Sequence, residues 1–336
     1  MLKWFLTLAL LTYTIASHAQ QYKYLVLRGG GIRGIAYAGA IKVLEEHNVT
    51  VGIEKVAGTS VGALSGLLFS LGYTAREMEG VLHTLDISTF NDGEAYFIGG
   101  QERLRKKFGW YKGNELEAWM GHRIKEQTGD DNTTFGQLHE LAIKDSKFKD
   151  LYVTATNLTR QQLEVFSYET YPDMPIKIAV RASVSVPLYY AAVFIDSTGK
   201  AVKHPVPGCN VYVDGGLVAN YPLDLFNTAE DNAHNRINEH TLGLKLERPE
   251  QIAHQQQYRP GIAPFRIHSF NSYMGALYNM TLEQLNKRIS YGEEKKHTVY
   301  ISTSNMSPRV RHITDEQKTV LFKNGEDGAR AFFSAP

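Results

Sequence analysis

The chain has 336 residues, 43% of them hydrophobic, and its 36 basic and 35 acidic residues give a formal net charge of +1 at pH 7. A near-neutral chain offers no electrostatic case for a nucleic-acid partner or for strong binding to anionic membranes. Its single cysteine, Cys209, excludes an intrachain disulfide. The residues after the N-terminal segment suit one large α/β domain rather than two, so we expect a single domain over residues 22–336.

Residues 1–19 are predicted to be a secretory signal peptide. Lys3 gives a positive start, residues 4–15 are mostly apolar, and Ser17-His18-Ala19 precedes a predicted cleavage before Gln20. The apolar stretch is too short for a permanent membrane anchor. We therefore expect an exported protein that is periplasmic or secreted, or that associates with a membrane from outside.

Apolar runs and helical periodicity alternate along the rest of the chain. Strands are predicted at Tyr24–Leu27, Glu54–Ala57, Leu151–Thr156, Val193–Ile195, Val211–Val213, Thr241–Leu246 and Val299–Ser302. Helices are predicted at Ile35–His47, Val61–Leu71, Glu115–Gln127 and Phe135–Ile143, the last with a capping box from Thr134 to Gln137. This order indicates a three-layer α/β/α fold around a mostly parallel central sheet, in which ligands bind at the carboxyl ends of the strands.

A glycine-rich loop, Gly29–Gly34, joins the first strand to the first helix. Its Gly-x-Gly-x-x-Gly pattern is that of a dinucleotide-binding loop, and Glu54 stands where a ribose ligand would be expected. In the alternative interpretation, the same unpaired amides at a helix N-terminus stabilise an oxyanion. The pattern by itself leaves both interpretations open.

A Gly-x-Ser-x-Gly motif, Gly58–Gly62, follows the second strand and precedes the second helix. A serine on such a strand-to-helix turn exposes a nucleophilic hydroxyl. We expect that a Cβ at Gly58 or Gly62 would clash, because strand and helix backbones crowd the turn. The motif therefore makes Ser60 a candidate nucleophile.

Asp214-Gly215-Gly216 follows a third apolar run. An aspartate at such a place is often an ordinary turn residue. A carboxylate within hydrogen-bond reach of a serine can also accept its proton directly when the site is shielded from water. Asp214 is therefore a candidate general base.

Together, the glycine loop, the serine motif and Asp214-Gly215-Gly216 resemble the motifs of the patatin-like phospholipase family, in the same chain order. Ile178–Pro187 is a fourth similar segment. The C-terminal part from Ile301 to Lys318 is similar to bacterial members, although Arg309-Val310-Arg311 replaces the aspartate–phenylalanine pair usual in the family. The resemblance implies a bacterial-type, exported member whose catalytic motifs lie within residues 24–225, with a helical part, residues 250–336, packed on them.

The resemblance also implies a lipid acyl hydrolase of phospholipase A or lysophospholipase type. Ser60 would be the nucleophile that forms an acyl-enzyme, and Asp214 the base. The substrate would be a phospholipid or another acyl ester, reached by transient contact with a membrane surface. No cofactor is implied, and no metal is expected because the chain has no ligand cluster with metal-binding spacing.

Supporting residues follow from the same resemblance. The Gly30 and Gly31 amides would hold the oxyanion, and Arg33 would either steer a phosphate headgroup or brace the loop. The implied residues are Gly29, Gly30, Gly31, Arg33 and Gly34 for the oxyanion hole, Gly58 and Gly62 for the nucleophile elbow, and Gly215 and Gly216 for the dyad motif.

Two alternatives to a Ser–Asp enzyme are considered. A Ser-His-Asp triad would need a histidine late in the chain, and His234, His240, His254, His268, His297 and His312 are available. An exported binding or storage protein could keep the scaffold without turnover.

Two aromatic-rich regions, Asp86–Lys112 and Phe265–Leu285, admit two interpretations. They are either helices that pack on the core or a lid or acyl-chain channel that presents apolar surface to a lipid.

Overall fold

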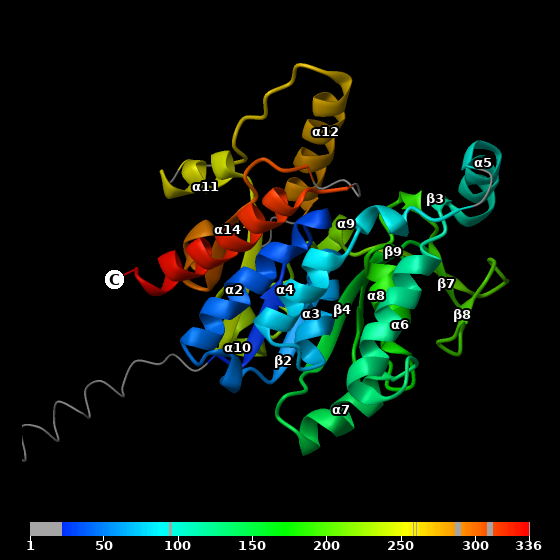
Figure 1. The fold of residues 1–336 in the computed structure, drawn as a ribbon, viewed down its shortest axis with the longest axis horizontal. Coiled ribbons are helices and arrows are strands. Elements are labelled where there is room, and N and C mark those ends of the chain that lie inside the picture. The colour runs from blue at the N-terminus through cyan, green and yellow to red at the C-terminus, as the bar shows by residue number, and fades with distance from the viewer. Residues whose placement is uncertain are drawn as a thin grey trace, which may run out of the picture.

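The computed structural model describes residues 22–93, 96–257, 259, 261–285, 290–307 and 312–335. In these residues a nine-stranded sheet is flanked by helices, and a separate pair of strands lies beside it (Figure 1). The predicted signal peptide and Arg309-Val310-Arg311 lie outside the described residues. No helix in the described part is both long and apolar enough to cross a bilayer.

The strands are β1 (Tyr24–Leu27), β2 (Lys55–Thr59), β3 (Gly109–Tyr111), β4 (Asp150–Asn157), β5 (Gln162–Phe166), β6 (Leu188–Tyr190), β7 (Val193–Ile195), β8 (Ala201–Val202), β9 (Asn210–Asp214), β10 (Thr241–Glu247) and β11 (Thr298–Ser302). The helices are α2 (Ile35–Glu46), α3 (Val61–Ser70), α4 (Ala75–Thr84), α5 (Tyr96–Lys107), α6 (Asn114–Thr128), α7 (Phe135–Lys144), α8 (Ile176–Ser183), α9 (Gly216–Ala219), α10 (Ala229–Ala233), α11 (Pro249–Gln256), α12 (Phe270–Leu285), α13 (Tyr291–Lys296) and α14 (Asp315–Phe333). Short 3₁₀ turns are η1 (Gly31–Gly34), η2 (Thr50–Gly52) and η3 (Ile87–Phe90).

Every predicted strand and helix is confirmed, with ends that shift by at most two residues, and the capping box at Thr134 is formed. The strands β3, β5, β6 and β8 were not predicted. Three of them have only two or three residues, which is too short for a readable period.

The parallel half of the sheet runs in the order β11-β10-β1-β2-β4. Alternate residues of β1 face opposite sides: Leu25 and Leu27 enter the main core with α2 and α3, whereas Val26 packs with Leu223 and Ile237 on the other face. Strands that are buried on both faces have continuous apolar sequences, so they could be predicted from the apolar runs in the sequence.

The sheet changes direction at β4, beyond which β9, β7 and β8 are antiparallel neighbours. Thr154 pairs with Thr59 of β2 and Ala155 pairs with Asp214 of β9, while β5 pairs with both Thr154 and Ala155. Because β5 occupies one edge of β4, β2 and β9 must share the other edge and meet end to end. Asp214 therefore reaches the carboxyl end of β2 from a strand that runs the opposite way, which the sequence did not predict.

The C-terminal part contributes both a strand and helices. β11 forms one edge of the sheet, and α14 packs along α2. In Figure 1, α12 stands out from the sheet beside α9, with which it is in contact.

The Phe265–Leu285 region is helical from Phe270 onward, as α12. Of the two interpretations, packing on the core does not hold for Phe270, Tyr273 and Leu277, whose side chains are exposed, as is that of Met280. The side chains of Met274, Tyr278 and Leu285 lie outside the described part. In the Asp86–Lys112 region, Phe90 is buried and Phe108 is exposed.

Candidate active site

Ser60 occupies the turn between β2 and α3. Its φ and ψ are 53° and −125°, a strained conformation for a residue with a Cβ. A Cβ at Gly58 would collide with the backbone of Gly62, and a Cβ at Gly62 would collide with the carbonyl oxygen of Leu27. The predicted crowding at these two glycines is confirmed, and it presents the serine at the carboxyl edge of β2.

The Ser60 hydroxyl points at the carboxylate of Asp214. Ser60 Oγ donates to Asp214 Oδ2 at 2.6 Å, and the Gly216 amide donates to Asp214 Oδ1 at 2.7 Å. Ser60 is 8% exposed and Asp214 is 5% exposed. Two residues that are far apart in the sequence therefore form one shielded pair.

Burial changes the acidity of Asp214. Removal from water raises the pKa of its carboxyl from 3.8 to about 6, while the hydrogen bonds from Ser60 and Gly216 act in the opposite direction. The carboxylate is still the dominant form at neutral pH and is a better proton acceptor than an exposed aspartate.

The region around α8 supports both members of the pair. Ser183 Oγ accepts the Ser60 amide hydrogen at 2.8 Å, and the Ser185 carbonyl accepts that of Asp214 at 2.8 Å. Arg181, which is buried, donates to the carbonyl of Gly113 at 3.0 Å. No role for Ser183 or Ser185 was predicted from the sequence. Their only signal was their place in the Ile178–Pro187 segment.

The glycine loop lies against the turn that carries the serine. A Cβ at Gly29 would lie 3.3 Å from the Ser60 Cβ. Gly30 is the N-cap of the η1 turn and Gly31 is its first residue, and neither amide has a hydrogen-bond acceptor in the described part of the chain. The Gly29 amide, by contrast, donates to the Asn220 carbonyl at 2.9 Å. This hydrogen bond of Gly29 therefore holds the loop in place, and the amides of Gly30 and Gly31 are left as unpaired donors in the loop.

Arg33 braces the loop. Its Nε donates to the Gly30 carbonyl at 2.6 Å, and Nη1 reaches the Met306 carbonyl at 3.4 Å. Burial, together with the nearby Arg28, lowers the pKa of Arg33 to about 10. Of the two roles considered for Arg33, these contacts support bracing of the loop.

The dinucleotide interpretation is wrong. Glu54 precedes β2 at the amino end of the sheet, whereas Gly29 follows the carboxyl end of β1. Its exposed side chain forms an ion pair with Lys23 at 3.3 Å. Glu54 therefore lies at the wrong end of the sheet to bind a ribose beside the loop.

The triad interpretation has no support in the described residues, where neither Ser60 nor Asp214 hydrogen-bonds to a histidine. His297, which is buried, has its Nδ1 3.1 Å from the Thr241 carbonyl oxygen.

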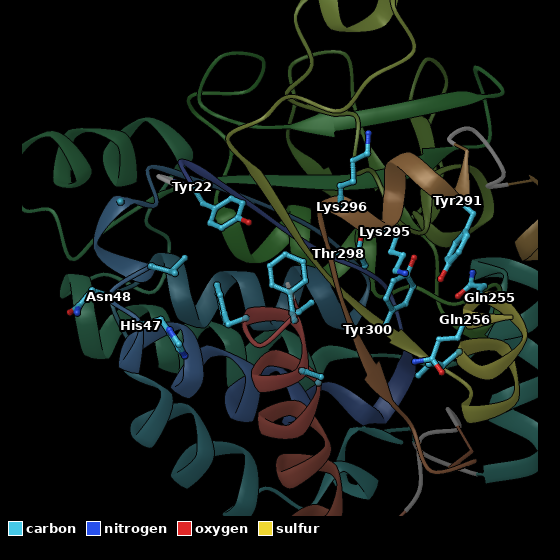
Figure 2. Close-up of a pocket in the computed structure, with 18 of the residues that line it drawn as sticks. Tyr22, His47, Asn48, Gln255, Gln256, Tyr291, Lys295, Lys296, Thr298 and Tyr300 are labelled. Carbon is cyan, nitrogen blue, oxygen red and sulfur yellow. The ribbon is translucent and has the colours of Figure 1, made fainter. Parts of the chain in front are cut away.

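A large cavity lies away from Ser60 and Asp214. It has a volume of about 1280 Å³ and follows the β11 edge of the sheet, among α11, α13 and the end of α14 (Figure 2). β10 and β1 separate this edge from β2 and Ser60. Residues that line it include Tyr22, His47, Tyr291, Tyr300, Phe332 and Phe333.

In this site, a buried serine on a strand-to-helix turn donates a hydrogen bond to a carboxylate of raised pKa and lies beside two unpaired amides. This arrangement is typical of acyl hydrolases. The model of the patatin-like phospholipase family matches residues 25–227, so the chain belongs to this family. The protein is a carboxylic ester hydrolase.

Relatives by sequence include viral proteins. Uncharacterized protein R571 of Acanthamoeba polyphaga mimivirus is 30% identical over 234 residues, which cover 67% of this chain and 71% of the relative. The probable lipid hydrolase 463L of Invertebrate iridescent virus 6 is 28% identical over 222 residues, which cover 63% and 66%. Among solved structures, VipD from Legionella pneumophila has a TM-score of 0.58 at 18% identity. The similarity covers 93% of this chain and 66% of VipD, and it shows that the two chains share a fold.

Proposed function

We propose that Ser60 and Asp214 form a catalytic dyad that hydrolyses lipid esters through an acyl-enzyme. The 2.6 Å hydrogen bond between Ser60 Oγ and the buried Asp214 carboxylate carries the proposal. At this distance the carboxylate can take the serine proton without an imidazole between them. The raised pKa of Asp214, about 6, supports this role at neutral pH.

Acylation begins when Ser60 Oγ bonds to the ester carbonyl carbon and its proton passes to Asp214 Oδ2. The carbonyl electron pair moves to oxygen, which accepts hydrogen bonds from the Gly30 and Gly31 amides. The positive end of the α3 dipole lies beside this charge. The carbon–oxygen bond to the alcohol then breaks, and the alcohol leaves with the proton from Asp214.

Deacylation repeats these steps with water. Asp214 takes a proton from water as the water oxygen bonds to the acyl carbon. The tetrahedral intermediate collapses, Ser60 Oγ leaves and recovers the proton from Asp214, and the fatty acid is released.

We propose phospholipids or other acyl esters at a lipid surface as substrates, with hydrolysis of phospholipase A or lysophospholipase type. The exposed apolar row of α12, from Phe270 to Met280, supports contact with lipid because α12 packs on α9, which begins two residues after Asp214. Replacing both Tyr273 and Leu277 with alanine should raise the apparent KM for long-chain esters more than for short-chain ones. Equal effects on both ester classes would count against this role.

We also propose that the protein is exported. This rests on the sequence of residues 1–19, and cleavage is expected before Gln20. N-terminal sequencing of the protein recovered from cell fractions tests it. A mature chain that starts at Met1 in the cytoplasmic fraction would contradict export.

The dyad is tested by lipid product analysis with phospholipids that carry different chains at their two acyl positions. Wild type should release fatty acid and should be labelled by a fluorophosphonate probe, whereas Ser60→Ala and Asp214→Asn should lose release. Ser70→Ala is the matched control, a buried serine at the far end of the same helix. Release by Ser60→Ala would refute the dyad. No release or labelling of wild type would favour a binding protein without turnover.

A further inference from the structure

Arg28 joins β1 to the glycine loop, and it is buried. Its amide donates to the Leu244 carbonyl at 3.1 Å, and its carbonyl accepts from the Tyr37 hydroxyl. Its Nη1 donates to the Leu246 carbonyl at 2.7 Å and to Glu247 Oε2 at 3.0 Å. The first residue before the loop is therefore fixed through both its backbone and its side chain.

The end of β10, which Arg28 holds, also packs on the loop. Gly30 has no room for a Cβ, because the side chain of Leu246 fills that space. Arg28 thus restrains the Gly30 amide from two directions: through the chain from Gly29 onward, and through Leu246. A planar guanidinium that binds several acceptors at once is well suited to fixing an orientation.

The other terminal nitrogen of Arg28 reaches α12. Nη2 donates to Oε1 of Glu283, a largely buried residue in the last turn of this helix. The same helix exposes Phe270, Tyr273 and Leu277. One side of α12 is therefore apolar and exposed, while Glu283 contacts the residue that precedes the proposed oxyanion loop.

The charges around Arg28 determine which variant is informative. Lys245 lies 3.8 Å from Glu247 and 2.7 Å from Glu294, so ion pairs join Arg28 and Lys245 to Glu247, Glu283 and Glu294. The charges of Arg33 and Arg248 also act on this cluster. Removal of Arg28 would break two ion pairs, those with Glu247 and Glu283. Removal of the Glu283 charge breaks the pair with Arg28 and leaves Arg28 paired with Glu247, so this change is the less disruptive one.

We propose that Arg28 is a positioning residue for the Gly30 and Gly31 amides, and that Glu283 of α12 holds the Arg28 guanidinium in place. The proposal rests on the proposed function of these amides as the oxyanion hole. It adds a link by which the exposed helix α12 restrains the loop beside Ser60. Neither residue touches the substrate in this role.

The test compares Glu283→Gln, Glu283→Ala and Gln284→Ala in the full chain. Gln284 is the exposed neighbour of Glu283 on α12 and serves as the matched control. Kinetics are measured on a soluble short-chain p-nitrophenyl ester, which does not depend on a lipid surface. Affinity is measured for a short-chain trifluoromethyl ketone, whose tetrahedral adduct with a serine carries an oxyanion.

Glu283→Ala should lower kcat roughly tenfold and raise the Ki of the ketone by a similar factor, because small displacements of catalytic groups have effects of this order or larger. KM should stay within about twofold, since the amides act on the transition state. Glu283→Gln should recover much of the loss, because its amide oxygen can still accept from Arg28. Gln284→Ala should match wild type.

Wild-type kcat and Ki in Glu283→Ala would overturn the proposal, as would a loss of kcat without a change in Ki. Thermal unfolding shows whether each variant folds. If Glu283→Ala does not fold, Arg28→Lys takes its place, because lysine keeps the charge but cannot reach the acceptors on Leu246, Glu247 and Glu283 together. Arg28→Lys must then show the same joint change in kcat and Ki. Failure of the proposed function would appear differently, as a wild-type protein that neither turns over the ester nor binds the ketone.

Discussion

Replacement of Asp214 by asparagine should make the protein more stable while it abolishes turnover. The folded-state pKa of about 6 lies about 2 units above the ordinary value of 3.8, and each unit corresponds to about 1.4 kcal/mol. A carboxyl whose pKa is raised on folding binds its proton more tightly in the folded state. Ionisation of the buried carboxyl therefore lowers the free energy of unfolding. This loss is absent well below pH 3.8, grows as pH rises, and is fully present above about pH 6. Asparagine is a neutral isostere that can still accept from Gly216.

The expected gain in the free energy of unfolding is about 3 kcal/mol at pH 8 and only about 0.5 kcal/mol at pH 4. For a chain of this size the gain at pH 8 corresponds to several degrees in Tm, on the order of 5 °C. Thermal unfolding of wild type and Asp214→Asn at both pH values, at one scan rate, measures it. Asp196→Asn is the control, because this partly exposed carboxylate accepts amide hydrogens from Thr198 and Lys200 and its variant should not gain stability. No gain for Asp214→Asn at pH 8, or an equal gain at both pH values, would refute the reasoning.

Three further predictions follow from the same site. The kcat/KM of wild type should fall as pH drops below about 6, because Asp214 becomes protonated, and a pH-stat profile that stays flat to pH 4 would contradict its role as base. Ser183→Ala removes the acceptor of the buried Ser60 amide, so it should lower both kcat and the free energy of unfolding. The expected loss of stability is about 1–3 kcal/mol, which urea titration measures. Gly62→Ala places a Cβ against the Leu27 carbonyl and should lower Tm and activity, whereas Gly80→Ala, which has open space, should change neither by much. Equal Tm values for these two glycine variants would show that the turn is not crowded.

The sequence predicted the local features well. Apolar runs located the strands that carry the motifs because those strands are buried on both faces, and the glycines at 58 and 62 indicated the crowded turn. It did not show that the Gly29 amide is already paired, because the acceptor, Asn220, is distant in the chain. It also left the packing of α12 open, because an apolar row with helical spacing looks the same whether it is covered or exposed.

The sequence by itself determined which residues could do the chemistry: a serine between two glycines, a glycine loop before a helix, and an aspartate at the end of an apolar run. Only the tertiary structure decided that they meet. β2 and β9 run in opposite directions along the same edge of β4, so Ser60 and Asp214 become neighbours across 154 positions of the chain. Burial at that junction raises the pKa of Asp214, because its ionised form loses the solvation of water. Pairing register and desolvation depend on contacts distant in the sequence, and local patterns do not record them.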